Sequence, residues 1–127
     1  MDYDGLKEKL NQLKTEDYIW LIYIGIIFLS WYSNSLERNY YVYKNEESKK
    51  KYRIIMIIIF SILVVVYLYF LKDSYSSLKT INPFDPKKKK DLIFLSFFAS
   101  LLIFISGIIF LYIAFTDEDL NVELAFN

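Results

Sequence analysis

Four polar residues near the end of the first apolar run are the side chains best placed to do chemistry. They are Ser30, Ser33, Asn34 and Glu37. Their spacing of i, i+3, i+4 and i+7 puts them on one face of a helix. Such a face hydrogen-bonds a neighbouring helix or lines a small polar vestibule. Plain helix-to-helix hydrogen bonding, or the emergence of the helix into the lipid headgroups, explains the same pattern. Glu37 stands next to Arg38, which disfavours a proton relay inside the membrane.

Most catalytic chemistry is excluded by residue type. The chain has no cysteine and no histidine, which removes disulfides, thiol nucleophiles, imidazole catalysis and the usual zinc sites. Glu37, Asp73 and Asp85 show no paired spacing that implies catalysis. The acidic segment 117–123 lacks the alternating ligands and central glycine of a calcium loop; it is either a solvated end or a strip that docks a partner. We therefore expect no enzymatic activity, no metal site and no cofactor.

Three long runs without a charged residue must position these side chains. They are 18–36, 54–71 and 92–116. As helices rising ~1.5 Å per residue they are roughly 27 to 37 Å long, enough to cross a hydrocarbon core of ~30 Å. Lipid offers no partners to backbone N–H and C=O groups, so these runs become helices although Ile, Val, Phe and Tyr favour strands in water. The sequence predicts an all-α integral membrane protein with three transmembrane helices.

Polar segments complete this single membrane domain of 127 residues. They are the N-terminal segment 1–17, a basic loop at 37–53, a Pro/Lys loop at 72–91 and an acidic tail at 117–127. None is long enough to bury a core of its own. An extramembrane catalytic domain is therefore excluded, and the function must be carried by the spans and their short flanks.

The N-terminal segment has an apolar stripe with spacings of three, four and three residues. Its members are Tyr3, Leu6, Leu10 and Leu13. This pattern predicts a short amphipathic helix that either lies along the membrane surface or pairs with a partner helix in a brief coiled coil. Thr15 is the expected N-cap of the first span, and Asp91 that of the third.

Small residues distinguish the third span from the others. The spacing singles out Ser96, Ser100, Gly107 and Ala114. Because small residues repeated at intervals of four and seven share one face and allow a second helix to approach closely, we interpret this face as the main packing seam. Simple scatter of small residues is the alternative. The 54–71 run, with Ser61 as its one hydroxyl in the run's interior, is interpreted as a central or lipid-facing helix.

Charge sets the expected orientation. Segments 1–17 and 72–91 together hold nine Lys and Arg residues, 37–53 holds six, and the tail holds none. The positive-inside rule then places the N-terminus inside and the acidic tail outside, unless one run fails to span and both basic loops share a side. Lysine outnumbers arginine 13 to 2, a bias typical of AT-rich bacterial genomes, so we expect a multi-pass protein of a bacterial plasma membrane.

Two functions fit this build. The first is a small accessory, regulatory or immunity-type membrane protein that packs against itself or a membrane partner; bacteriocin immunity and phage exclusion proteins have a similar architecture. The alternative is a holin-like or channel-like pore made of several copies. An acidic tail and the lack of a continuous polar face in the spans argue against the pore. We expect the lipid bilayer as a partner and no nucleic-acid binding.

Overall fold

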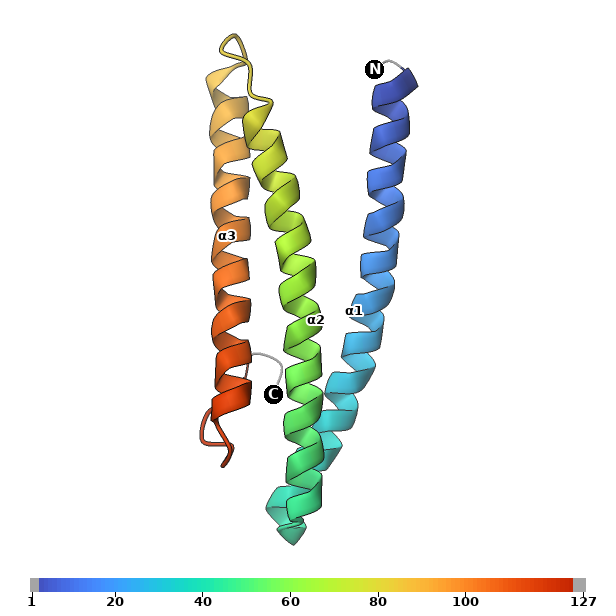
Figure 1. Ribbon diagram of the computed structural model, residues 1–127, viewed down its shortest axis with the longest axis vertical. Helices are drawn as coiled ribbons and strands as arrows, with labels where there is room; N and C mark the ends of the chain where they lie inside the picture. The colour runs from blue at the N-terminus through green and yellow to red at the C-terminus, as the bar shows by residue number, and fades with distance from the viewer. Residues whose placement is uncertain (1–2, 125–127) are drawn as a thin grey trace.

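The computed structural model describes residues 3–124, whose regular structure is entirely helical (Figure 1). Its elements are α1 (Tyr3–Tyr43), α2 (Glu46–Lys79) and α3 (Lys87–Thr116). All three helices are long and apolar enough to cross a membrane, which confirms the all-α class and the expected number of candidate spans.

The two ends of the bundle differ in the segments that meet there (Figure 1). The α1–α2 connection, the last turn of α3 and the tail residues 117–124 lie at one end, which we call the hairpin end. The start of α1 and the α2–α3 connection lie at the opposite end, which we call the N-terminal end. Neighbouring helices therefore run antiparallel.

Helix α1 extends far beyond the predicted first span. It has 41 residues, roughly 62 Å at ~1.5 Å per residue. The segment 1–17 was expected to hold a separate short helix, but its described residues 3–17 form the first part of α1. Thr15 is not an N-cap, because its Oγ1 donates to the carbonyl of Asn11 at 3.2 Å within the helix. The Leu, Lys, Glu and Gln of this segment favour helix, and a change from water to lipid gives a helix no reason to end.

The predicted basic loop 37–53 is mostly helix, and the α1–α2 connection consists of Lys44 and Asn45. Lys44 ends α1 by adopting a left-handed backbone conformation with φ 51°. Asn45 then caps α2, since its side-chain oxygen accepts from the amides of Glu47 at 3.0 Å and Ser48 at 3.3 Å. This cap satisfies two of the free N–H groups that every helix start exposes. Polar residues alone therefore do not mark the ends of these helices.

The Pro/Lys loop is also shorter than predicted, because α2 continues to Lys79 and α3 begins at Lys87. Asp85 accepts from the amide of Asn82 at 2.9 Å, which closes a tight turn. Pro86 takes the N-cap position with φ −57°, a value that its ring fixes and that suits a helix start. Asp91, the expected N-cap, lies one turn inside α3.

Helix α2 lies between the other two, and no Cα of α1 comes within 8 Å of a Cα of α3 (Figure 1). One face of α2 is buried. Its buried residues are Tyr52, Met56, Ile59, Phe60, Leu63 and Val66. The opposite face is exposed. Its large apolar residues include Ile54, Ile58, Val65 and Leu68. Helix α2 is thus central to the bundle along one face and exposed along the other.

Helix α3 packs on α2 through the small residues Gly107 and Ala114 and through partly buried apolar side chains such as Phe110, whose ring stacks on Phe60. Among its residues only Gly107 and Ala114 are buried, and most of its aromatic and aliphatic side chains point outward. A Cβ added at Gly107 would lie 3.0 Å from Cδ2 of Tyr67 and 3.4 Å from Cγ2 of Val64. Glycine is therefore what allows α3 to approach α2 this closely.

Replacing Gly107 by leucine tests this contact. The new side chain must push Tyr67 or the whole of α3 aside, so we expect Gly107→Leu to lower the free energy of unfolding by about 1–3 kcal/mol. Gly25→Leu is the matched control: Gly25 is also inside a helix, but nothing lies within 4 Å of an added Cβ. Unfolding of the purified protein in a detergent titration measures both changes. Equal stability of the two variants would contradict the contact.

Candidate functional site at the hairpin end

The predicted polar stripe on α1 divides between two environments. Ser33 is fully buried, and its Oγ donates to the carbonyl of Ser30 at 2.7 Å. Glu37 is half-buried and accepts a hydrogen bond from the Tyr52 hydroxyl of α2. Asn34 is exposed. At 100° per residue Asn34 lies ~60° from the centre of this face, so α2 covers the serines and the glutamate but not the amide.

The three inward members of the stripe therefore belong to the α1–α2 interface. Ser30 and Ser33 have small side chains at the level of the buried core that contains Ile26, Met56 and Ile59. Small residues at such a level let two helices approach closely. The geometry fits the helix-packing interpretation of the stripe.

The predicted seam on α3 is also directed mostly at α2. Ser100 Oγ lies 2.9 Å from Ser74 Oγ, and Gly107 and Ala114 are buried. Ser96 is exposed. The structure thus brings three of the four residues together along one face, and the helix that meets this face is α2 of the same chain.

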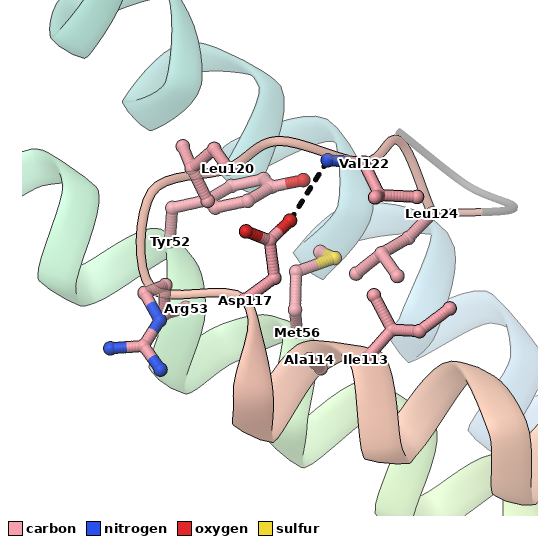
Figure 2. A pocket seen from close by; sticks show the side chains of 9 residues that line it. All are labelled: Tyr52, Arg53, Met56, Ile113, Ala114, Asp117, Leu120, Val122 and Leu124. Atoms are coloured by element: carbon pink, nitrogen blue, oxygen red, sulfur yellow. Dashed lines mark hydrogen bonds between the residues drawn. The ribbon is translucent and has the colours of Figure 1, made fainter.

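The acidic tail folds back onto the bundle at the hairpin end. Asp117 is the C-cap of α3, and its carboxylate accepts from the amides of Asn121 at 3.0 Å and Val122 at 2.8 Å (Figure 2). Leu120, between them and the cap, adopts a left-handed conformation with φ 55°. These features reverse the direction of the chain directly after the helix ends.

One cation of α2 binds this reversed tail, and a second binds the last turn of α3. Lys49 Nζ lies 3.3 Å from Oδ1 of Asp119, and one guanidinium nitrogen of Arg53 donates to the carbonyl of Phe115 at 3.1 Å. Leu124 is only 8% exposed and joins the core that contains Tyr52. At the hairpin end, polar contacts therefore surround the buried side chain of Leu124 and hold the tail against the helices.

A small cavity remains beneath the tail (Figure 2). Its lining consists of Tyr52, Arg53, Met56, Ile113, Ala114, Asp117, Leu120, Val122 and Leu124. Its volume is about 10 Å³, roughly what one water molecule needs and far below the ~300 Å³ of a small-ligand site. The surrounding side chains are arranged to hold the tail in place.

Outside this cavity the tail presents Asp117, Glu118 and Asp119 to an open groove. Asp117 is already engaged by two backbone amides, and Asp119 by Lys49. Within residues 3–124, no three His, Cys, Asp or Glu residues are grouped so that they could hold a metal ion.

Sequence reasoning missed this anchoring of the tail. A partial signal was present in Leu120 and Leu124, apolar residues of an otherwise polar tail. Both are covered in the structure, although Val122 between them is 54% exposed. Their partners were not predictable, because Tyr52 and Arg53 were assigned to a loop.

No family model, curated protein or solved structure matches this chain. The function is therefore argued from the residues and their arrangement.

The anchoring of the tail predicts a pH dependence. Hydrogen bonds from backbone amides, first that of Asn121 and then that of Val122, lower the pKa of Asp117 below its ordinary value. A lowered folded-state pKa means that the anchor is fully present above the unfolded carboxyl pKa of ~4 and is lost as the pH falls through the folded value. We expect amide-exchange protection factors of Asn121 and Val122 to be constant near neutral pH and to fall only in that acidic range.

Asp117→Asn removes the charge that makes these bonds strong. At neutral pH we expect the protection of both amides to drop about two- to fivefold, the size typical of an exposed charge interaction. Glu118→Gln is the matched control, because it removes an exposed neighbouring charge without touching the turn. If both variants keep the protection of the unmodified protein, Asp117 does not anchor the tail.

Proposed function

We propose that this chain is a small, non-enzymatic integral membrane protein of the accessory, regulatory or immunity type, which acts by packing its helices against a membrane partner or another copy. The observation that carries this proposal is the open arrangement of the bundle. Helices α1 and α3 contact α2 but not one another, so each keeps a broad apolar face directed outward.

The apolar runs of α1 and α2 lie side by side at the same height along the bundle axis, which supports insertion into a bilayer. At the hairpin end Glu37 meets Tyr52, and at the N-terminal end the amide nitrogen of Gln12 donates to both carboxylate oxygens of Asp73 at 2.9 and 3.0 Å. These polar contacts bracket the apolar runs 18–36 and 54–71, which therefore form one slab of roughly 27 Å. A hydrocarbon core of ~30 Å matches that slab.

The outward faces have the character of helix-packing surfaces. Gly25 of α1 is exposed, and nothing lies within 4 Å of a Cβ added there. A glycine on an apolar face lets a second helix approach the backbone closely in lipid. On α3, only 6% of the most apolar stretch is buried inside the chain. Lateral association through these faces would not disturb the contacts of the tail at the hairpin end.

Photo-crosslinking in native membranes tests the proposal. A small aliphatic diazirine amino acid at Ile27 of α1 or Ile109 of α3, which are 62% and 53% exposed, is expected to give a discrete protein adduct from at least one helix. The matched control is Ile26, one residue along and 4% exposed, which is expected to react only within the chain. Adducts with lipid alone at both outward positions would contradict the proposal.

Dye release from vesicles separates this function from the pore alternative. A pore formed by several copies releases a trapped fluorophore when purified protein is added, whereas an accessory protein leaves the vesicles sealed. Release at low protein-to-lipid ratio, together with a self-adduct at Ile27 or Ile109, would favour the pore.

We further propose a bacterial plasma membrane as the location, with the N-terminus inside and the acidic tail outside. The N-terminal end of the bundle carries nine Lys and Arg residues and the hairpin end six, and the positive-inside rule places the more basic end in the cytoplasm.

Cysteine labelling tests this orientation, because the chain has no cysteine of its own. In spheroplasts, a membrane-impermeant maleimide is expected to label Glu118→Cys directly but Ser76→Cys only after lysis; both positions are exposed. The opposite pattern would reverse the orientation. Labelling of both variants without lysis would mean that α3 does not cross.

A further inference from the structure

The part of α1 that precedes its apolar run carries an apolar stripe that the rest of the described chain does not cover. Tyr3, Leu6, Leu10 and Leu13 are 78%, 47%, 56% and 43% exposed. Their spacing of three, four and three residues places them on one side of the helix. The partly buried residues in this part of α1 are Gly5, Gln12 and Glu16. They lie ~120° around the helix from the stripe.

A bilayer that covers the apolar runs cannot cover this stripe. Residues 3–17 continue the same unbroken helix toward the N-terminal end (Figure 1), about 22 Å beyond the run that begins at 18. The bidentate contact of Gln12 with Asp73 ties this extension to α2. To lie flat on the membrane surface, α1 would have to break its helix and give up that contact.

Within residues 3–14 the charges beside the stripe are sorted by sign, whereas Asp17, one turn beyond Leu13, is in line with the stripe. Lys7 and Lys14 lie on one side of it and Lys9 on the other, and all three are exposed. Asp4 and Glu8 point to the far side of the helix. Among the described residues, none forms an ion pair with these three lysines within 4 Å. The stripe is therefore an apolar strip between free cations.

This pattern selects one occupant. In a parallel pair of two copies, Lys9 of one chain would face Lys14 of the other, and like charges at these flanking positions oppose pairing. The acidic tail of the same chain is held at the opposite end of the bundle. A helix with an apolar stripe and acidic flanks, supplied by another protein, fits both the apolar strip and its charges.

We propose that residues 3–14 of α1 form a docking surface for an acidic amphipathic helix of a partner protein. The inference rests on the proposed function, because the membrane is what keeps this surface upright and away from lipid. Since α1 is already folded here as the extension of a longer helix, docking orders only the partner segment, which lowers the entropic cost of so short an interface.

Binding of two synthetic peptides to the full chain tests this surface. Both peptides contain three heptads with leucine at 3–4 spacing; one carries glutamate and the other lysine at the flanking positions. With the protein in zwitterionic nanodiscs, and empty nanodiscs subtracted, we expect the acidic peptide to bind at least about tenfold more tightly by fluorescence anisotropy. Equal binding of both peptides, or no binding of the acidic one, would overturn the proposal.

Two sets of variants assign the effect to the surface. Changing Lys7, Lys9 and Lys14 together to glutamate is expected to reverse the preference, so that the basic peptide binds more tightly. Leu6→Gln with Leu10→Gln is expected to weaken the acidic peptide at least about tenfold. All five positions are exposed, and circular dichroism checks that the helices persist. An unchanged preference in the charge-reversed protein would overturn the proposal.

A second copy as occupant is tested separately. Leu10→Cys is expected to form no disulfide-linked dimer in nanodiscs that contain two chains, and efficient dimer formation would replace the partner helix by another copy. If the peptides fail while the outward positions Ile27 or Ile109 still give protein adducts, the docking surface is wrong and the proposed function stands. If the chain does not insert into membranes, both fail.

Discussion

The whole bundle depends on the buried face of α2. Helices α1 and α3 have no close contact with one another, so neither would keep its place without Met56, Ile59, Phe60 and Leu63 between them. For helices surrounded by lipid, this face does not contribute by removing apolar surface from water. It contributes through the density of its van der Waals contacts, which is why small residues are found opposite it. Ser33 on α1 and Gly107 on α3 play the same part on the two sides of α2.

The same requirement explains why polar contacts concentrate at the ends. Side chains that hydrogen-bond between helices are placed where the apolar runs finish: Tyr52 with Glu37, Arg53 with the carbonyl of Phe115, and Gln12 with Asp73. Between α2 and α3, Ser74 lies just beyond the run 54–71, and its Oγ is 2.9 Å from Oγ of Ser100, which is inside the run 92–116. Apolar packing sets how closely the helices approach, and the polar pairs at each end fix their register along the axis.

The sequence predicted the helices well because charge-free runs of 18 residues or more have one regular structure available in lipid. It predicted their ends poorly. Residues such as Glu37 and Lys49 were assigned to a loop since they are polar, yet a helix leaves the membrane without ending. What ends α1 is the left-handed backbone at Lys44, and what starts α2 is the side-chain cap of Asn45. Both are local backbone events that hydropathy does not report.

The candidate site shows the same division. Helical spacing placed Ser30, Ser33 and Glu37 on one face, and the structure puts that face against α2. Spacing alone did not separate Asn34, which lies at the edge of the face, because the width of an interface depends on the neighbour and not on the helix itself. The tail was harder still. Its anchoring requires Leu124 and Asp119 to meet residues about 70 positions earlier in the chain, and no pattern within the tail names that partner.

The two ends of the molecule differ in whether the cations described above are paired within the chain. At the hairpin end two cations are paired within the chain. Lys49 pairs with Asp119 and Glu46, and Arg53 donates a hydrogen bond to a carbonyl at the end of α3. At the N-terminal end no residue within 3–124 forms an ion pair with the flanking lysines of α1, and the apolar residues between them are exposed. An exposed apolar strip beside unpaired charges has the character of an interaction surface, which is why we propose that a partner docks at the N-terminal end. In that proposal the closed hairpin end holds the three helices together while the N-terminal end binds.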